Sequence, residues 1–250
     1  MASPTSILSF LLLLPLTAAV SSTQVIKMYP KQHVVGAEPK CESWKFSIEV
    51  NNAGSWKSIP PTCIDFVKDY FNSGRYLADS RSVAAFSLNF ARSVKVSEGD
   101  AWIFDVDETL LSNLPFYKDH EFGLQPYNDT SFFEWVKKGS APALPASLTV
   151  YNWLKKLGFK IFILTGRDES LRAVTEQNLI DAGYSGWEKL ILRGPNDDKK
   201  NIEYKSEKRA ELVNQGYTIQ GSSGDQWSDL MGFALAKRSF KLPNPIYYFP

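Results

Sequence analysis

The fold that we expect rests on the stretch Ala101-Trp102-Ile103-Phe104-Asp105-Val106-Asp107-Glu108-Thr109-Leu110-Leu111. Its apolar run predicts a buried parallel strand over 101–105 that ends where charged residues begin. Ligands of open α/β sheets bind at the carboxyl ends of strands, so reactive groups are expected there. Asp105 and Asp107 would lie close together at that end. Crowded carboxylates raise each other's pKa unless a cation neutralises them, and Mg²⁺ suits carboxylates together with phosphate.

This stretch allows two interpretations. A carboxylate can attack phosphorus as a nucleophile and form an aspartyl-phosphate, which would make Asp105 or Asp107 a catalytic group. The plainer alternative is a strand followed by an acidic turn, because short motifs also match by chance. The rest of the chain has to decide between them.

Length and composition favour a globular protein with a large core. The chain has 250 residues, 44% of them hydrophobic, and a formal net charge of +1. This charge gives no electrostatic reason to expect nucleic acid or an acidic membrane as partner.

Residues 1–22 have the features of a secretory signal peptide. The apolar run 7–16 is too short to span a bilayer, Pro15 interrupts it, and small residues follow at 17–19. A membrane anchor is the less favoured alternative. The signal peptide implies passage through the secretory pathway, to the cell exterior or the vacuole, and no membrane association of the mature protein.

Two features fit that pathway. Cys41 and Cys63 are the two cysteines of the chain, and in a secreted protein we expect them to pair. Asn128 begins an Asn-x-Thr sequon, so it is a candidate glycosylation site and is expected to be exposed.

Apolar periodicity predicts strands that alternate with helices, which is typical of a parallel sheet with right-handed crossovers. Residues 43–50 alternate like a short strand, within an otherwise irregular arm. Two helices are expected within 62–93, divided at Gly74. The further helices are expected at 131–138, 146–157, 171–180 and 205–214, and the further strands at 159–164, 189–192, 217–222, 234–235 and 246–249.

The segment 112–145 interrupts this alternation and is rich in aromatic residues. An insertion directly after the strand that carries the reactive groups can cover the site, so these aromatic residues could form a cap that faces the substrate. For any single aromatic residue, packing within a small accessory layer is the alternative.

Polar groups with different chemistry follow three of the predicted strands. Thr165 and Gly166 are expected at the start of a helix, where a hydroxyl and backbone N–H groups can hold a phosphoryl oxygen. Lys205 is expected at the start of the helix 205–214, placed to neutralise developing charge. Asp225 and Asp229 follow the strand 217–222. Together with the first acidic pair, these groups describe metal-assisted phosphoryl transfer.

Four motifs in this order resemble those of haloacid dehalogenase-type phosphatases. They are Asp105-x-Asp107-x-Thr109, Leu164-Thr165-Gly166-Arg167, Lys205 and Gly224-Asp225-Gln226-Trp227-Ser228-Asp229. The chain more closely resembles plant class B acid phosphatases and the related vegetative storage proteins, over essentially the mature chain. The resemblance implies a Rossmann-like parallel sheet with helices on both faces, a helical N-terminal extension over 23–100, a phosphatase core over 101–250 and a small cap at 112–145.

The resemblance also implies roles for single residues. Asp105 would be the nucleophile, and Asp107 the acid that protonates the leaving alcohol and then the base that activates water. Thr165, Gly166 and Lys205 would hold the phosphoryl oxygens. Mg²⁺ would be bound by Asp105, the Asp107 carbonyl and Asp225, with Asp229 as a ligand through water or a support. Lys199, Lys200 and Lys208 are alternatives to Lys205, and Asp229 could instead cap a helix.

We therefore expect a secreted or vacuolar Mg²⁺-dependent acid phosphatase acting on small phosphate monoesters. The alternative is a vegetative storage protein, an amino-acid reserve with little activity. The acidic optimum and a possible homodimer are implied by the resemblance alone.

Overall fold

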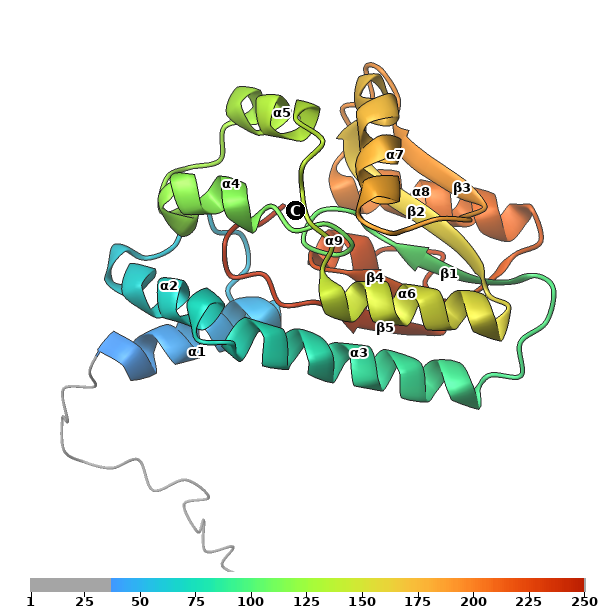
Figure 1. The fold of residues 1–250 in the computed structure, drawn as a ribbon, viewed down its shortest axis with the longest axis horizontal. Helices are drawn as coiled ribbons and strands as arrows, with labels where there is room; N and C mark the ends of the chain where they lie inside the picture. The colour runs from blue at the N-terminus through green and yellow to red at the C-terminus, as the bar shows by residue number, and fades with distance from the viewer. Residues whose placement is uncertain (1–36, 250) are drawn as a thin grey trace, which may run out of the picture. The chain divides into compact units, whose positions relative to one another are not determined.

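Strand β1 (Asp100–Phe104) lies in the middle of a five-stranded sheet in the computed structural model, which describes residues 37–249. The strand order is β3-β2-β1-β4-β5, and every neighbouring pair is parallel. The other strands are β2 (Lys160–Asp168), β3 (Lys189–Arg193), β4 (Thr218–Gly224) and β5 (Arg238–Lys241). The α/β architecture expected from the sequence is confirmed (Figure 1).

Helices cover both faces of this sheet. The α-helices are α1 (Ala37–Glu49), α2 (Ile64–Asn72), α3 (Arg75–Ser93), α4 (Leu114–Asp119), α5 (Asp129–Lys137), α6 (Pro145–Leu157), α7 (Arg172–Asp181), α8 (Asn201–Asn214) and α9 (Trp227–Leu230). Short 3-10 helices occupy Pro61–Cys63, Glu121–Gly123 and Glu169–Leu171. Side chains alternate along β1, so Trp102 and Phe104 pack with α3, α6 and α7, whereas Ala101 and Ile103 pack with α8.

The position of β1 against β4 is fixed by one close contact. Trp102 stacks on Phe240 with 5.3 Å between ring centroids, and its Nε1 donates a hydrogen bond to Ser223 Oγ at 3.0 Å. A Cβ atom on Gly221 would lie 2.4 Å from the Trp102 ring, so only glycine allows this approach. The contact aligns the carboxyl ends of β1 and β4, where the acidic motifs begin.

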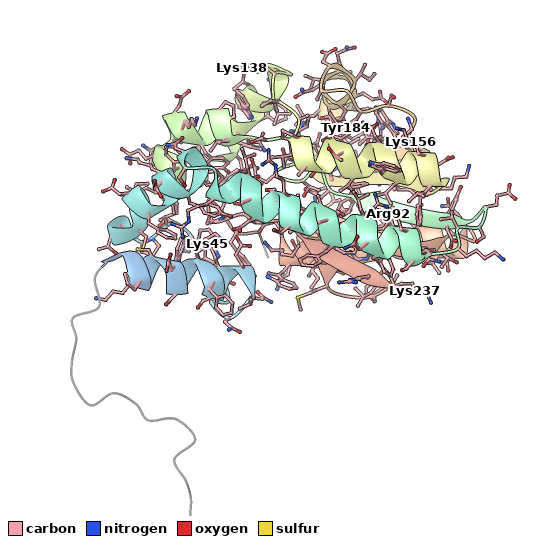
Figure 2. The ribbon with its side chains drawn as sticks, turned by 60° about the horizontal axis from the view of Figure 1, so that its bottom comes forward. Lys45, Arg92, Lys138, Lys156, Tyr184 and Lys237 are labelled. Carbon is pink, nitrogen blue, oxygen red and sulfur yellow. A yellow bond between two sulfur atoms is a disulfide. The ribbon has the colours of Figure 1, made fainter. Side chains whose placement is uncertain are left out.

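Helices α3 and α6 lie side by side against the sheet, as Figure 2 shows from below. Arg92 of α3 and Lys156 of α6 lie over the same ring, that of the half-exposed Trp153, at 5.2 and 5.4 Å from its centroid. Gly74, with φ of 88°, separates α2 from α3, so the predicted division of this helical stretch is confirmed.

The predicted strand at 43–50 is wrong, because residues 43–49 belong to helix α1 and Val50 lies in the turn that follows. The buried and partly buried apolar residues of α1, Cys41, Trp44 and Ile48, recur at helical spacing. The alternation that suggested a strand came from Phe46, which is 65% exposed. Tertiary packing, rather than local alternation, therefore decides the conformation here.

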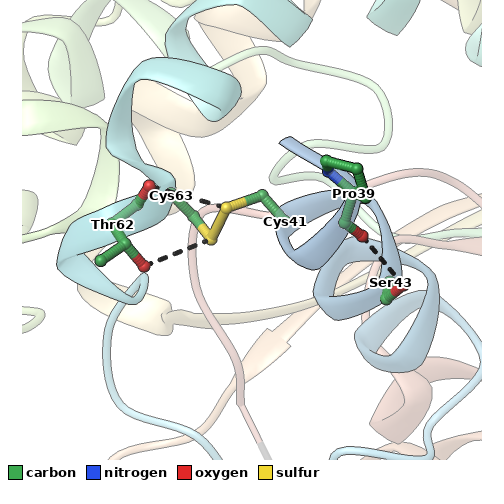
Figure 3. The surroundings of a disulfide bond; sticks show 5 residues. All are labelled: Pro39, Cys41, Ser43, Thr62 and Cys63. Atoms are coloured by element: carbon green, nitrogen blue, oxygen red, sulfur yellow. Dashed lines mark hydrogen bonds between the residues drawn. A yellow bond between two sulfur atoms is a disulfide. The ribbon is translucent and has the colours of Figure 1, made fainter. Parts of the chain in front are cut away.

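The predicted pairing of the cysteines is confirmed. Cys41 of α1 and Cys63 form a disulfide with 5.4 Å between the Cα atoms (Figure 3). This bond joins α1 to the short helix that precedes α2. The signal peptide predicted at 1–22 lies outside the described residues, and none of the helices within 37–249 is long and apolar enough to cross a bilayer.

The short strands predicted at 234–235 and 246–249 are also wrong. The last strand is β5, and residues 242–249, here called the C-terminal tail, run on without regular structure. Pro243 and Pro245 have no N–H to donate to a sheet ladder. The tail is nevertheless mostly buried, and its side chains reach the carboxyl end of the sheet.

Candidate active site

A cavity of about 320 Å³ opens at the carboxyl ends of β1, β2 and β4. Its lining combines residues of all four motifs with aromatic side chains from residues 127–133 and from the tail. The lining residues are Asp105, Asp107, Tyr127, Asp129, Phe132, Phe133, Gly166, Arg167, Asp168, Leu171, Asn201, Lys205, Asp225, Gln226, Asp229, Tyr247 and Phe249. The position agrees with the general rule for ligand sites in open α/β sheets.

A buried lysine joins two carboxylates on the floor of this cavity. Lys205 Nζ lies 2.6 Å from Asp105 Oδ1 and also forms an ion pair with Asp229, and all three residues are buried. Lys199 and Lys208 form surface ion pairs with glutamates and Lys200 is exposed, so none of the alternatives is placed as Lys205 is. Lys205 lies one turn inside α8, because the helix begins at Asn201, four residues earlier than predicted.

Burial dominates the electrostatics of these acids. It raises the pKa of Asp105 well above its ordinary value, and the Lys205 ammonium opposes that shift. Burial, followed by the Asp229 carboxylate, raises the pKa of Asp225 to about 7. Concentrated negative charge in a dry site requires a further cation to keep all the carboxylates ionised.

The donor set fits a hard divalent cation. One carboxylate oxygen from each of Asp105, Asp225 and Asp229 lies within 4.8 Å of the others, and oxygen ligands are those that Mg²⁺ prefers. Two donors hold the Asp225 Oδ2 atom, Gln226 Nε2 and Asn244 Nδ2, each at 2.6 Å. These two hydrogen bonds therefore fix the orientation of the Asp225 carboxylate within the acidic cluster.

Asp229 caps a helix, which is the alternative that the sequence left open for it, and it also contacts Lys205. Its Oδ2 accepts a hydrogen bond from the backbone N–H of Gln226 at 2.9 Å, which forms a capping box at the start of α9. Its Oδ1 meets Lys205. The capping contact thus fixes the carboxylate that faces the acidic cluster.

Asp107 points to a different partner. Arg167 holds it with two hydrogen bonds, from Nε to Oδ2 at 3.0 Å and from Nη2 to Oδ1 at 2.7 Å, and Asn113 Nδ2 donates to Oδ1 at 2.8 Å. Burial opposes ionisation of Asp107, but the Arg167 ion pair outweighs it and the pKa lies below its ordinary value. The two aspartates of the first motif, two residues apart, therefore have pKa values shifted in opposite directions.

Thr165 and Gly166 are not at a helix start, contrary to the prediction. Strand β2 continues to Asp168, and α7 begins only at Arg172. The pairing of β2 with β3 shifts register between Leu164 and Asp168, so the ladder is irregular where these residues lie. Thr165 is buried and its Oγ1 accepts the Arg167 N–H at 3.2 Å, while Gly166 lines the cavity.

The aromatic residues of 112–145 lie in two different environments. Phe116, Tyr117 and Phe122 are buried in an apolar cluster with α1, α2 and the tail. Tyr127, Phe132 and Phe133 line the cavity instead. Packing within an accessory layer therefore describes the first set of side chains, whereas the second set lies at the cavity, and the cap stays a prediction.

Sequence reasoning missed the groups that orient the motif residues. Glu108, at φ of 51°, accepts hydrogen bonds from the N–H and Nδ2 of Asn113 and from Tyr247 OH at 2.7 Å. Burial raises the pKa of Glu108 to about 7, and the Asp107 carboxylate adds to that effect. The aromatic tail carried a signal, but it was interpreted as a strand.

Fold and site together define a phosphoryl-transfer domain, with an aspartate pair after the central strand and a lysine against the acidic cluster. A family model described as HAD superfamily, subfamily IIIB (acid phosphatase), matches residues 27–250. The chain belongs to this family.

Individual relatives agree. The chain is 48% identical to acid phosphatase 1 of Solanum lycopersicum over 236 residues, which cover 93% of this chain and 92% of that protein. It is 46% identical to the stem 28 kDa glycoprotein of Glycine max, with 84% of each chain covered, and 35% identical to vegetative storage protein 2 of Arabidopsis thaliana, with 97% and 98% covered. Among solved structures, the class C acid phosphatase of Bacillus anthracis with tungstate bound shares the fold, with a TM-score of 0.60 and 22% identity over 74% of this chain and 85% of that one.

Proposed function

We propose that the protein hydrolyses small phosphate monoesters at acidic pH through an aspartyl-phosphate on Asp105, with Mg²⁺ as cofactor. The observation that carries this proposal is the buried Asp105 carboxylate on the cavity floor, paired with Lys205 at 2.6 Å and adjacent to Asp225 and Asp229. The alternative of a plain acidic turn does not account for these buried charges. Taking charged groups out of water costs free energy, so such a turn would leave them at the surface.

In the proposed reaction an Asp105 oxygen attacks phosphorus and the bond from phosphorus to the alcohol oxygen breaks. Asp107 donates its proton to that leaving oxygen. Asp107, now ionised, takes a proton from water, whose oxygen attacks the phosphorus. The bond between phosphorus and Asp105 then breaks, which releases phosphate and restores both carboxyl groups. Lys205, with Thr165 and Gly166, stabilises the charge on the phosphoryl oxygens.

The pairing of Asp107 with Arg167 supports an acidic optimum. Asp107 must carry a proton to act as an acid, yet its ion pair with Arg167 keeps its pKa below the ordinary value. The protonated fraction therefore grows as the pH falls. Released from Arg167 when an ester enters, the same carboxyl group would face the leaving oxygen.

The metal would be held by Asp105, Asp225 and Asp229, with the Asp107 carbonyl as the further ligand that the family resemblance implies. When bound, Mg²⁺ would neutralise the acidic cluster and polarise a phosphoryl oxygen. Burial of all three carboxylates supports a cation there, because without it two groups in the cluster, Asp105 and Asp225, have strongly raised pKa values.

The alternative function is an amino-acid reserve, which the 35% identity to a vegetative storage protein favours. A reserve needs only abundance and later proteolysis, so it does not require any of these contacts. Asp105 and Asp229 both contact Lys205, and Asp225 lies beside them, which supports catalysis. Storage and catalysis do not exclude each other.

Steady-state hydrolysis of p-nitrophenyl phosphate by the purified mature protein tests the proposal. We expect turnover that falls above neutral pH, disappears after treatment with EDTA and returns with Mg²⁺ better than with Zn²⁺. Asp105→Asn is the matched control because it keeps the side-chain size. Wild-type turnover no greater than that of this variant would make storage the leading function, and full activity after exhaustive EDTA treatment would remove the metal.

The cellular setting is part of the same proposal. We infer a secretory route to the vacuole or the cell exterior, supported by the confirmed disulfide and by the exposed Asn128. Asn128 also caps the N-terminus of α5, where its Oδ1 accepts the Ser131 N–H at 2.9 Å. An N-linked glycan on Nδ2 would leave that contact possible. Residues 112–145 would serve as a cap over the site. We also propose a homodimer, which analytical ultracentrifugation would test.

A further inference from the structure

The C-terminal tail passes directly beside the acidic cluster. Asn244 is buried in this tail, and its Nδ2 donates a hydrogen bond of 2.6 Å to Asp225 Oδ2. The other Asp225 oxygen, Oδ1, has a long contact of 3.4 Å with Thr109 Oγ1. Asn244 thus holds one oxygen of the carboxylate and leaves the second available to a cation.

Asn244 is in turn fixed from the opposite side by the N-terminal extension. Its backbone N–H donates to Glu49 Oε1 at 2.9 Å, and Lys241 Nζ forms an ion pair with Glu49 Oε2 at 2.8 Å. The Oδ1 atom of Asn244 accepts the N–H of Ile246 at 2.9 Å, which sets the amide so that Nδ2 faces Asp225. Both polar atoms of this side chain therefore have a fixed partner, Asp225 for Nδ2 and Ile246 for Oδ1.

Glu49 is the last residue of α1, a helix that the Cys41–Cys63 disulfide ties to the segment before α2. Its side chain is only 15% exposed, so the ion pair with Lys241 is largely shielded from water. An ion pair of this kind keeps its geometry better than a surface pair. A continuous set of contacts consequently runs from the extension, through the tail, to Asp225.

We propose that Asn244 is a positioning residue for Asp225 and that Glu49 holds Asn244 in place, so that the N-terminal extension controls the affinity of the site for its divalent cation. The inference rests on the proposed function, since it assigns Asp225 as a metal ligand. Hydrogen-bond partners that orient ligating carboxylates typically change metal affinity by roughly 10- to 100-fold when removed.

The test measures Mg²⁺ binding by isothermal titration calorimetry, with the metal alone as ligand. Asn244→Ala should weaken binding by roughly 10-fold or more. Glu49→Ala, which touches no motif residue, should weaken it by a smaller factor in the same direction. Glu42→Ala is the matched control, because Glu42 also lies on α1 but pairs with the exposed Arg75. It should leave the dissociation constant close to that of wild type.

A second readout separates positioning from general loosening. The Mg²⁺ concentration that gives half-maximal activity should rise in Asn244→Ala, while the KM for the ester at saturating Mg²⁺ should stay close to that of wild type. Should Asn244→Ala fail to fold, two other variants carry the test. Asn244→Leu keeps the number and branching of the side-chain heavy atoms, and Glu49→Ala keeps the tail sequence.

Equal Mg²⁺ affinity in wild type, the Asn244 variant and Glu49→Ala would overturn the inference, as would equal losses in Glu49→Ala and Glu42→Ala. Wild-type protein that binds no Mg²⁺ and shows no turnover would instead overturn the proposed function. The two failures are thus distinguishable in a single set of titrations.

Discussion

Replacing Lys205 by methionine isolates the electrostatics of the site. The change keeps most of the apolar side chain but removes the ammonium that lies against Asp105 and Asp229. Lys205 is 4% exposed and both carboxylates are buried, so solvent screens them poorly. Removing one partner of a buried ion pair costs about 3–5 kcal/mol, and here two carboxylates lose their partner. We expect a loss of about 4 kcal/mol in the free energy of unfolding at pH 7 without metal.

Lys208→Met is the matched control on the same helix. Lys208 pairs with Glu211 at the surface, so its loss should cost less than about 1 kcal/mol. Urea denaturation followed by tryptophan fluorescence measures both variants, with EDTA and then with Mg²⁺. The deficit of Lys205→Met should shrink with Mg²⁺, and also at pH 5, because the raised pKa of Asp105 lets that group take up a proton.

Turnover of Lys205→Met should nevertheless fall by roughly 10²- to 10³-fold even at saturating Mg²⁺, since a donor aimed at developing charge is lost. A Lys205→Met protein that unfolds at the same urea concentration as Lys208→Met would refute the reasoning. It would mean that the acidic cluster is neutralised in some other way, and the assignment of Lys205 would have to be withdrawn.

Asp105→Asn should reduce turnover by roughly 10³-fold or more, which corresponds to a rise of about 4 kcal/mol in the activation barrier. Wild-type turnover in this variant would exclude Asp105 as the nucleophile. Asp107→Asn should also strongly reduce steady-state turnover. In pre-steady-state assays the variant should slow the release of p-nitrophenol less than that of a simple alkyl alcohol, because p-nitrophenol needs less help from an acid to leave. The folded pKa of Asp225, about 7, lies above its unfolded value of 3.8, so metal-free protein should lose stability as pH rises between these values, by about 4 kcal/mol for this group. Urea midpoints in EDTA that are no lower at pH 7.5 than at pH 5 would contradict this, and Mg²⁺ should restore more stability at the higher pH. Reducing the Cys41–Cys63 disulfide should lower the free energy of unfolding by about 3 kcal/mol, which calorimetry with and without reductant would measure.

Strands β1 to β4 and the acidic residues could be predicted because their signal is local, whereas β5 was not predicted. Trp102 to Phe104 followed by Asp105 marks a buried strand that ends in charge, and the structure places it in the centre of the sheet. The choice of Lys205 over its neighbours came from motif resemblance. Its burial depends on α8 packing across the sheet, which no local pattern records.

Contacts between distant segments could not be predicted. Asn244 contacts Asp225, which lies 19 residues earlier in the sequence, and Glu49, which lies 195 residues earlier. Nothing in the sequence around Asn244 indicates either contact. Phe46 misled the interpretation of α1 because an exposed aromatic residue imitates strand alternation. The aromatic residues of the tail 246–249 suggested a strand for a similar reason. Their side chains pack in an apolar cluster with helices and line the cavity, and the tail joins no sheet.

The strand order has a consequence for how the protein is made. Strand β1 pairs on one side with β2, 60 residues later in the chain, but on its other side with β4, so that Phe104 lies opposite Ser223. During synthesis one edge of β1 therefore keeps its backbone N–H and C=O groups unpaired until more than a hundred further residues have emerged. Such non-local parallel pairing is slow and exposes the chain to aggregation. We expect the Cys41–Cys63 bond, which closes early, to form well before the site that it supports, leaving an oxidised but inactive intermediate for chaperones to bind.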